Sequence, residues 1–594
     1  MSSTHSKRIT PEKPAAPRPD EAESLDVWGF RDTHFDFTEN GEVVIRGSRY
    51  ELSGKELPRF LPWVREVLQV DVNPNNVNRP HYPTSIPEPR IRPEFLAALQ
   101  KFSSPNQIET NGEARMRHGH GHTQEEMYAI KYAQLGRIPD LIVYPEGEDQ
   151  VTALVEAAKA HEVTLIPYGG GTNVTDALRC DEREQRTIVS VDMQRMNRIL
   201  WIDRDNMLAC IEAGAVGRHI IANLKKYGLT IGHEPDSVEF STLGGWIATN
   251  ASGMKKNRYG NIEDIVLDVN VVTSAGKLER TSPSPRESVG MDLRRLIFGS
   301  EGTLGIITSA IVKIFAAPTV QQYGSVLFPT FEDGFRFMFD VARQTTLPAS
   351  VRLMDNLQFQ FGQALKPKSR GGLANFKSRA EKLFVTKIKG FDPNKMVACT
   401  LVFEGTGEEV EQQQRDVYRI ASQHSGMKAG AENGRRGYQL TFSIAYIRDF
   451  LMSYYIIAES FETSVSWTNA LTLLENVKNR LVEEHKRRGL PGNPFLSARV
   501  TQLYRTGVCI YFYFGFYYKG IPNPQEVYLE LENIAREEIL KCGGSLSHHH
   551  GVGKLRRAFL PKIMSETALQ WKRDLKKTFD PKNVFGAGNQ GLDG

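Results

Sequence analysis

The spacing of hydrophobic and polar positions predicts a β-α-β unit in the first half of the chain. Residues 141–144 (Leu-Ile-Val-Tyr) form a short apolar run that is typical of a buried strand, and residues 164–166 form another. Between them, four apolar side chains recur at helical spacing: Val151, Leu154, Val155 and Ala158. Further strands are predicted at 188–191, 209–213 and 266–273, up to about residue 315.

Beyond Pro318 the pattern predicts a second domain built on an antiparallel sheet. Strands are expected at 324–328, 350–354, 397–403 and 508–518, and helices near 408–425 and 444–458. In the last strand, alternation places Val508, Ile510, Phe512, Phe514 and Phe516 on one face, and Cys509, Tyr511 and Tyr513 on the other. Tyr511 is either a cross-strand packing residue or a phenol that acts as an acid or base.

The remaining segments complete an α+β organisation. Residues 1 to about 25 are rich in Pro, Ser, Lys and Glu and predict a flexible tail. Residues 57–70 predict an amphipathic helix, which packs on its own domain or, alternatively, lies on a membrane surface. Residues 366–389 are basic and predict a mobile, solvated loop. The expected parts are 1–48 (flexible tail and lead-in), 49–135 (N-terminal helical region), 136–316, 317–545 and 546–594.

Composition disfavours several classes of protein. The chain has 594 residues and a net charge of only +4, which disfavours a nucleic-acid partner. Its five cysteines lack C-x-x-C spacing, which disfavours a disulfide framework and a thiolate zinc site. No run of about 18 apolar residues is present, so we expect a soluble or peripheral protein.

Three glycine-bearing loops follow apolar runs, at 167–173, 244–253 and 299–305. Glycine lets backbone N–H groups approach a diphosphate, and neighbouring Ser and Thr residues add donors. The loops match neither the G-x-G-x-x-G dinucleotide motif nor the G-K-S/T phosphate loop. They therefore predict a large nucleotide cofactor that is held in another way.

Two histidine clusters are candidates for chemistry. His548, His549 and His550 precede Lys554 and Arg556, a combination suited to proton transfer or to binding an anionic substrate; an incidental surface loop is the alternative. Adjacent side chains diverge, so a metal is disfavoured there. In residues 118–122 (His-Gly-His-Gly-His), metal binding is possible on a strand, but the glycines favour a surface segment.

Several motifs together resemble the alkyldihydroxyacetonephosphate synthase family of vanillyl-alcohol-oxidase-type FAD proteins. The resemblance runs from about residue 28 to 586, and its main stretches are 166–172, 232–242, 253–257, 350–356, 445–449 and 547–554. It implies a two-subdomain FAD-binding domain of the VAO/PCMH type at 136–316, an antiparallel-sheet cap that binds substrate at 317–545, and a C-terminal segment that completes the active site. The ending after Gly586 departs from the family.

The resemblance implies ether-lipid synthesis. Members exchange the acyl group of acyl-dihydroxyacetone phosphate for a long-chain fatty alcohol, by redox-neutral covalent chemistry at N5 of the flavin. A FAD-dependent 2-hydroxy-acid dehydrogenase is the alternative enzyme, and a catalytically silent membrane scaffold is the alternative from another class. Thr172 stands where some relatives carry a flavin-linking histidine, so we expect FAD to be bound non-covalently.

The resemblance also assigns roles to residues. Tyr511 donates or accepts a proton; His548, His549 and His550 handle proton transfer and the phosphate; Arg352 supports the active site; and Arg448 binds a substrate anion. No metal is expected. The residues that line FAD are Pro167, Tyr168, Gly169, Gly170, Gly171, Thr172, Asn173, Asp236, Ser237, Val238, Glu239, Phe240, Ser241, Thr242, Thr249, Asn250, Ala251, Ser252, Glu301, Gly302, Thr303, Leu304, Gly305, Ile306 and Ile307.

By the same resemblance we expect a homodimer, peripheral membrane contact and a peroxisomal location. The residues 592–594 (Leu-Asp-Gly) do not resemble a Ser-Lys-Leu address, and Arg8-Ile9 is not followed by the His-Leu pair of an N-terminal address. The expected location therefore rests on the family alone.

Overall fold

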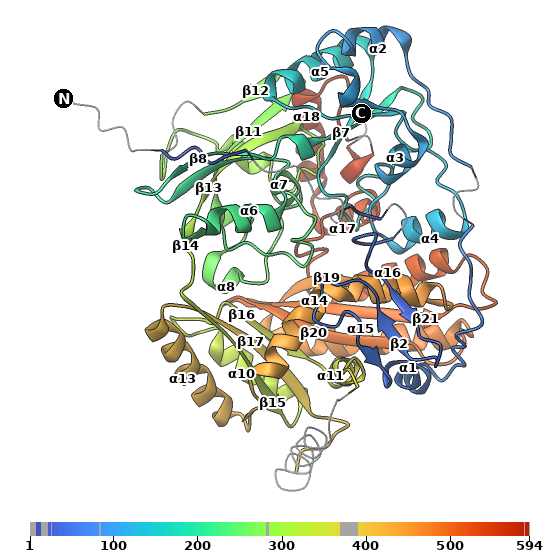
Figure 1. Cartoon of the computed structure of the whole chain (residues 1–594), viewed down its shortest axis with the longest axis vertical. Helices are drawn as coiled ribbons and strands as arrows, with labels where there is room; N and C mark the ends of the chain where they lie inside the picture. The colour runs from blue at the N-terminus through green and yellow to red at the C-terminus, as the bar shows by residue number, and fades with distance from the viewer. Residues whose placement is uncertain are drawn as a thin grey trace. The chain divides into compact units, whose positions relative to one another are not determined.

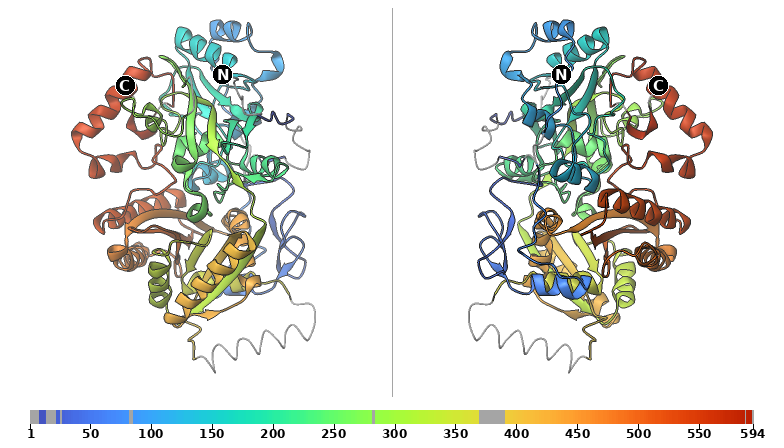
Figure 2. Two further views of the ribbon diagram at one scale, coloured as in Figure 1. Left: turned by 90° about the vertical axis from the view of Figure 1, so that its left-hand side faces the viewer. Right: turned by 90° about the vertical axis from the view of Figure 1, so that its right-hand side faces the viewer.

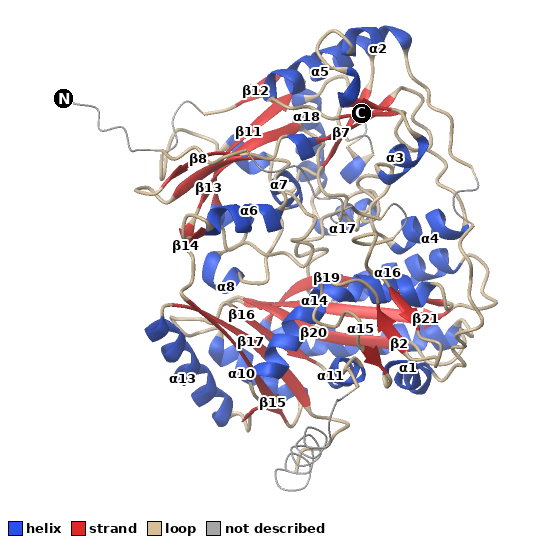
Figure 3. Cartoon of the chain, in the orientation of Figure 1, coloured by secondary structure: helices blue, strands red, loops and turns tan. Residues whose placement is uncertain are grey.

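The computed structural model describes residues 8–13, 22–24, 27–81, 85–280, 284–368, 390–586 and 588–592 (Figure 1). The chain divides into two compact units. Unit 1 comprises Met1–Arg18, His81–Ala317 and His549–Gly594, and unit 2 comprises Pro19–Pro80 and Pro318–His548. Both units mix helices and strands (Figure 3), as expected for an α+β protein.

Unit 1 contains a four-stranded and a five-stranded sheet. The first has the order β4 (Ile108–Glu109), β5 (Leu141–Val143), β7 (Ile188–Asp192), β6 (Thr164–Tyr168). β5 and β6 run parallel to β7, and α5 (Glu148–His161) connects β5 to β6, which confirms the β-α-β prediction. The second sheet is antiparallel, in the order β12 (Gly276–Leu278), β11 (Val266–Thr273), β13 (Ile306–Lys313), β9 (Leu208–Glu212), β8 (Ile199–Asp203).

Shorter elements complete unit 1. β10 (Leu229–Thr230) and β14 (Phe315–Ala316) form a separate pair. The helices are α2 (Pro93–Leu99), α3 (Gly112–Arg117), α4 (Gln124–Tyr132), α6 (Gly217–Lys225), α7 (Leu243–Thr249), α8 (Lys256–Tyr259), α9 (Ile262–Ile265), α17 (Leu560–Ile563) and α18 (Glu566–Phe579).

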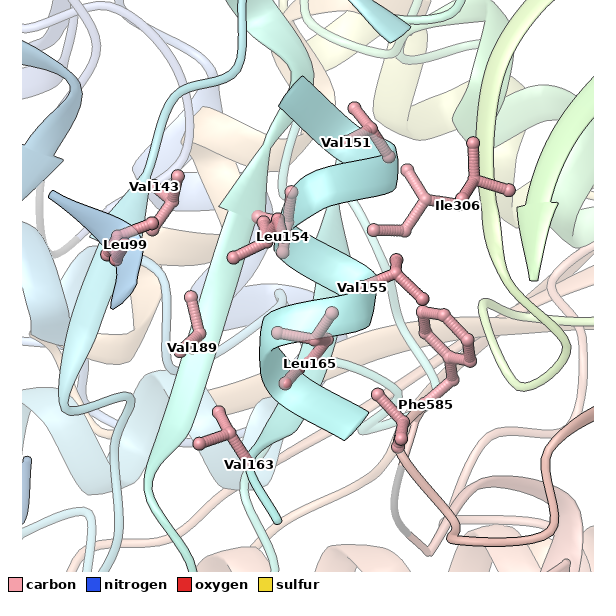
Figure 4. Close-up of a cluster of buried hydrophobic side chains, with 14 of the residues drawn as sticks. Leu99, Val143, Val151, Leu154, Val155, Val163, Leu165, Val189, Ile306 and Phe585 are labelled. Carbon is pink, nitrogen blue, oxygen red and sulfur yellow. The ribbon is translucent and has the colours of Figure 1, made fainter. Parts of the chain in front are cut away.

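The core beneath α5 joins distant parts of the sequence. The apolar stripe of α5 packs on Leu165 and Val189 of the first sheet and on Ile306 of the second (Figure 4). Phe585 enters the same cluster and pairs with Leu165 in a parallel bridge. The N–H of Leu165 donates to the carbonyl of Val584 at 2.7 Å. Residues 584–586 therefore extend the edge of β6.

Unit 2 is built on a seven-stranded sheet whose paired strands are all antiparallel, which confirms the predicted second sheet. The order is β18 (Met427–Lys428), β15 (Val320–Phe328), β17 (Val397–Gly405), β16 (Ser350–Met354), β20 (Phe495–Leu503), β21 (Gly507–Tyr517), β19 (Ile456–Ser466). A small sheet contains β1 (Phe35–Phe37), β2 (Val43–Ile45) and β3 (Glu56–Leu57). The helices are α1 (Phe60–Leu68), α10 (Phe331–Val341), α11 (Asn356–Ala364), α13 (Gly407–Gln423), α14 (Ala431–Met452), α15 (Trp467–Arg487) and α16 (Pro524–Lys541).

Helices flank the seven-stranded sheet (Figure 2). On its apolar face, Phe514 and Phe516 contact the Tyr528 ring of α16, and Phe328 contacts Phe337 of α10. On the opposite face, α14 lies over the strands, since Thr441 accepts a hydrogen bond from Arg352 of β16. One face therefore builds core, and the other places polar side chains in a buried layer.

The structure corrects three sequence predictions. The helix expected at 444–458 is α14, which ends at Met452, and residue 456 already begins β19. The lead-in that follows the predicted tail, for which no element was predicted, contains β1 and β2. The region 49–135, expected as one helical part, is divided between the units at residue 80.

The helix expected at 57–70 is α1, and its Trp63 packs on Phe361 and Phe495 of unit 2, which favours the packing interpretation.

The segment expected to be a mobile loop at 366–389 lies largely outside the described residues, as does most of the predicted tail. No helix in the part of the chain that the structure describes is both long and apolar enough to cross a bilayer.

Candidate active site

The stretches predicted to line a nucleotide meet one another in unit 1. A Cβ on Gly170 would lie 2.0 Å from the carbonyl oxygen of Phe240, and one on Gly302 would lie 3.1 Å from Cδ of Pro167. The N–H of Glu301 donates to the carbonyl of Ala248 at 2.8 Å. The loops after β6, before and after α7, and before β13 therefore form one continuous surface.

Local capping explains how these loops are held. Thr242 caps the N-terminus of α7, where its side chain accepts from the N–H of Gly245. Trp246 of α7 donates from Nε1 to the Ser241 hydroxyl at 2.8 Å. Asn250 ends α7 in a left-handed conformation with φ of 52°, so the chain turns sharply into the 249–252 stretch.

The first glycine loop has the donors that a diphosphate needs. The backbone N–H groups of Gly170, Gly171 and Thr172 donate no hydrogen bond to any residue that the structure describes. They follow the carboxyl end of β6, where α/β sheets present ligand-binding groups. Gly171 has φ of 68°, which favours glycine. Successive N–H donors without intrachain partners fit the oxygens of a nucleotide diphosphate.

The His-Gly segment at 118–122 supports this loop, which corrects the expectation of a surface segment. All three histidines are buried. Nε2 of His118 lies 2.8 Å from Asp192, and its Nδ1 lies 2.7 Å from the carbonyl of Ala114. The N–H of His122 donates to the carbonyl of Asn173 at 2.7 Å. Both ring nitrogens of His118 are engaged within the chain, so the segment positions the loop and does not present a three-histidine metal site.

Glu301 connects the third glycine loop to the C-terminal segment. Its carboxylate accepts the N–H groups of Val552 at 2.5 Å and Gly553 at 2.7 Å, and the side chain of Gln590 at 3.1 Å. Burial raises the pKa of Glu301, although the hydrogen bonds from Val552 and Gly553 oppose this effect. Gln590 also donates to the carbonyl of Gly299 at 2.6 Å. Sequence reasoning missed this role, because a single Gln in a Gly-rich ending carries no pattern.

Lys554 and Arg556 act within the same segment. Nζ of Lys554 donates to Oδ1 of Asn589 at 2.6 Å, and Nη1 of Arg556 donates to the carbonyl of Gly551 at 2.7 Å. Arg556 is only 1% exposed. Both cations therefore support the fold of the segment that carries His549 and His550, whose rings lie 4.6 Å apart. The expectation that Lys554 and Arg556 help to bind an anionic substrate stays a prediction.

In unit 2, Tyr511 lies on the polar face of the sheet, on β21 beside the edge strand β19. It stands opposite Glu462 of β19 and Arg499 of β20, so the three side chains share one face. The guanidinium of Arg499 lies over the Tyr511 and Tyr513 rings, at 5.0 and 5.2 Å from their centroids. Tyr511 and Arg499 are both buried. Sequence reasoning missed Arg499 and Glu462, because isolated charges in strands resemble solvent-facing positions.

Arg352 lies on the same face as Tyr511. Met354 stands opposite Arg499, and Arg352 is two residues away on β16, so alternation returns it to that face. Its Nη1 donates to Oγ1 of Thr441 at 2.9 Å. Two residues that the sequence identified separately are therefore brought to one buried layer.

His548 is held on the same layer. Glu462 accepts hydrogen bonds from the backbone N–H of His548 and, at 2.7 Å, from the Ser547 hydroxyl. Nε2 of His548 and the Tyr504 hydroxyl are 2.6 Å apart and share a hydrogen bond. These contacts fix the imidazole, which is partly exposed.

Arg448 belongs to a buried ion-pair network. It lies 2.9 Å from Asp449 and 2.7 Å from Glu459. Burial alone would lower the pKa of Arg448, but these two carboxylates outweigh it and raise the pKa above its usual value. Ser460, next to Glu459, donates from its hydroxyl to the Tyr511 hydroxyl at 3.3 Å. Arg448 is thus linked to Tyr511 through β19, and its binding of a substrate anion stays a prediction.

The predicted site residues are divided between the two units. The nucleotide stretches, His549 and His550 belong to unit 1, and Tyr511, Arg352, Arg448 and His548 belong to unit 2. Unit 1 provides the donors of a cofactor cradle. Unit 2 provides a phenol, an imidazole and guanidinium groups in a buried layer, which suits proton transfer beside an anion.

Comparison with known proteins agrees with this division. Residues 139–282 match the family model described as "FAD binding domain", and residues 317–589 match "FAD linked oxidases, C-terminal domain". The cofactor is therefore FAD, and the N–H row of the first glycine loop fits it.

Full-length relatives give a closer match. The alkyldihydroxyacetonephosphate synthase of Caenorhabditis elegans is 43% identical, covering 95% of this chain and 94% of the relative. That of Dictyostelium discoideum is 35% identical over 84% and 80%. A solved alkyldihydroxyacetonephosphate synthase structure superposes with a TM-score of 0.83 at 30% identity, covering 95% of this chain and 98% of that one.

Proposed function

Because the chain belongs to the alkyldihydroxyacetonephosphate synthase family of FAD-linked enzymes, we propose that it exchanges the acyl group of acyl-dihydroxyacetone phosphate for a long-chain fatty alcohol. The products are alkyl-dihydroxyacetone phosphate and a fatty acid, which makes the protein an ether-lipid transferase. The observation that carries this proposal is the full-length similarity, supported by the buried layer that holds Tyr511, Arg352 and His548 on one face.

Each unit supplies a different part of the chemistry. FAD, when bound, supplies an electron sink that lets a C–O bond exchange without net oxidation. The backbone N–H groups of the first glycine loop in unit 1 would hold its diphosphate. In unit 2, we assign proton transfer to the Tyr511 hydroxyl, which accepts a hydrogen bond from Ser460, and to the imidazole of His548, which shares a hydrogen bond with Tyr504.

The guanidinium groups suit the charge of the substrate. A glycerone phosphate is dianionic and needs Arg or Lys partners when it leaves water. Arg352 and Arg499 lie on the Tyr511 face and are both buried, so a phosphate near them is poorly screened by solvent. The same burial excludes water that would hydrolyse the acyl substrate.

A spectrum of the FAD-loaded protein, recorded without oxygen, tests the proposal. We expect acyl-dihydroxyacetone phosphate alone to bleach the flavin, and labelled hexadecanol to enter the product without an electron acceptor. A 2-hydroxy-acid dehydrogenase would behave differently, because its flavin bleaches with a hydroxy acid and turns over with a dye. Dye reduction by a hydroxy acid without alcohol incorporation would replace our proposal by this alternative.

We also propose that the enzyme contacts a membrane surface, where its lipid substrates reside. Trp571 and Leu575 stand four residues apart on α18, and Trp571 is 69% exposed. Exposed Lys577 and Lys562 lie on and beside the same helix. Tryptophan and lysine are typical of helices that lie at a lipid interface. The sequence had offered α1 as an alternative membrane-surface helix, but its Trp63 packs on Phe361 within unit 2.

Co-sedimentation with anionic vesicles tests this contact. Trp571→Ser is expected to weaken vesicle binding, and Val482→Ser, at another exposed apolar position on α15, is the matched control. Equal binding by both variants and the unmodified protein would rule out α18 as the contact. A peroxisomal location and a homodimer belong to the same proposal on the strength of the family alone, and cell fractionation and mass measurement in solution test them.

A further inference from the structure

We propose that unit 2 carries a zinc site formed by Glu462, Cys509 and His548, and that occupancy of this site inhibits the enzyme. The carboxylate, the thiol and the imidazole each offer one ligand atom, and these atoms lie within 4.8 Å of one another. Nothing in the family comparison assigns a metal to these residues. The inhibitory part of this inference rests on the proposed role of His548 in proton transfer.

The sheet brings the three ligands together from separate parts of the chain. Cys509 stands opposite Ser464 on β19, and alternation places Glu462 on the same face, two residues along. His548 reaches this face because its backbone N–H bonds to the Glu462 carboxylate. This arrangement avoids the objection to a metal at adjacent histidines, since only one imidazole of the triplet is needed.

The ligand set selects a borderline or soft cation. Thiolate, imidazole and carboxylate match the sulfur, nitrogen and oxygen donors of zinc sites, whereas magnesium and calcium prefer oxygen donors. The thiolate and the carboxylate together balance the charge of Zn²⁺. Binding displaces the thiol proton into solvent, so affinity is expected to rise with pH.

Two of the proposed zinc ligands are shielded from solvent, and the third is partly accessible to it. Cys509 and Glu462 are buried at 0% and 1% exposure, and His548 is partly exposed. Glu462 is oriented by the Ser547 hydroxyl at 2.7 Å, a contact of the kind that fixes ligands around metals. Three protein ligands leave a fourth position for water, as in catalytic zinc sites.

Zinc binding would act directly on the proposed chemistry. The imidazole of His548 has one ring nitrogen 2.6 Å from the Tyr504 hydroxyl. A ring that coordinates zinc cannot accept a proton at the coordinating nitrogen. We therefore expect micromolar zinc to slow alcohol exchange without releasing FAD.

The experiment compares two buried cysteines of the same sheet. Cys509→Ser removes the proposed ligand, and Cys399→Ser, at a buried cysteine of β17, is the matched control. Calorimetric titration of the FAD-loaded proteins with zinc chloride should show one site in the unmodified chain and in Cys399→Ser, weakened at least about tenfold in Cys509→Ser. In the absence of zinc, Cys509→Ser should exchange alcohol normally.

A zinc-edge X-ray absorption spectrum supplies a measurement that does not depend on how the variants fold. It should contain one sulfur neighbour of the metal at about 2.3 Å. A shell of only nitrogen and oxygen, or equal zinc affinity in all three proteins, would overturn the inference. If zinc binds as expected but exchange activity is absent, the site stands and the proposed function fails.

Discussion

The guanidinium of Arg499 lies over the ring of Tyr511, with its carbon 5.0 Å from the ring centroid. The two residues face each other on neighbouring strands, so the contact is fixed by strand register. A buried cation over an aromatic face is worth about 0.5–2 kcal/mol, and it also orients the phenol. We predict that Arg499→Gln retains FAD but lowers kcat roughly two- to thirtyfold. A steady-state exchange assay checks this, and an unchanged kcat would contradict it.

The hydroxyl of Tyr511 is expected to carry a proton in the reaction. Tyr511→Phe removes only this oxygen and leaves the ring beneath Arg499. We predict that the variant keeps its flavin spectrum and loses exchange by at least about a hundredfold, the usual scale for a positioned acid or base. Tyr513→Phe, two residues along the strand, is the control. Near-normal turnover of Tyr511→Phe would remove this residue from the mechanism.

The contact between Gly170 and Phe240 leaves no room for a side chain. Gly170→Ala would place a carbon 2.0 Å from the Phe240 carbonyl oxygen, so the loop must move away from the stretch before α7. We expect the purified variant to lose most of its FAD absorbance. Gly147→Ala is the control, because nothing lies within 4 Å of a Cβ at that position. Equal flavin content in the two variants would contradict the convergence of these loops.

Stability should fall as pH rises because of Glu126. Burial and the neighbouring Asp176 carboxyl raise the pKa of Glu126 from 4.5 to about 8. Between these values the folded form holds a proton that the unfolded form has released, so raising the pH lowers the free energy of unfolding. We predict that this group makes the melting temperature fall between about pH 5 and about pH 8, and that the fall is smaller in Glu126→Gln.

Glu156→Gln, at an exposed position of α5, serves as the control for this pH dependence and should behave as the unmodified protein does. A melting temperature that responds to pH equally in all three proteins would show that the carboxyl pair has no such effect.

FAD is expected to leave the protein on denaturation. Thr172, in the loop after β6, carries a hydroxyl and has no imidazole or thiol that could link covalently to the flavin. Acid precipitation should therefore leave a yellow supernatant and a colourless pellet. Retention of the colour in the pellet would show a covalent attachment elsewhere.

The sequence predicted those elements whose burial follows a simple period. α5 packs an apolar stripe on a buried parallel sheet, and its four buried positions were identified from their spacing. β21 alternates between core and polar layer, and its bounds were predicted to within one residue. α14 was predicted poorly, because it lies over the polar face and buries Thr441, Ser443 and Asp449 among its apolar residues, which interrupts the apolar period. The buried Glu462 similarly obscured β19.

The residues of the candidate site likewise include some that the sequence identified and some that it could not identify. The glycine loops and Tyr511 stand out because their composition is unusual for their elements. Arg499, Glu462 and Gln590 could not be identified, since each gains its role from partners distant in the sequence. The histidines at 118–122 were placed at the surface because their glycines disfavour a strand. Those glycines instead permit close approach to Asn173, whose carbonyl would lie 2.3 Å from a Cβ on Gly121.

The pairing of Leu165 with Phe585 constrains how the polypeptide is made. The ribosome releases β6 long before residues 584–586 exist, and the intervening Pro318–His548 segment belongs to the other unit. Throughout that interval an unpaired strand edge and the gap left by Phe585 are open to other chains. Newly synthesised protein is therefore expected to depend on chaperones until its translation is nearly finished.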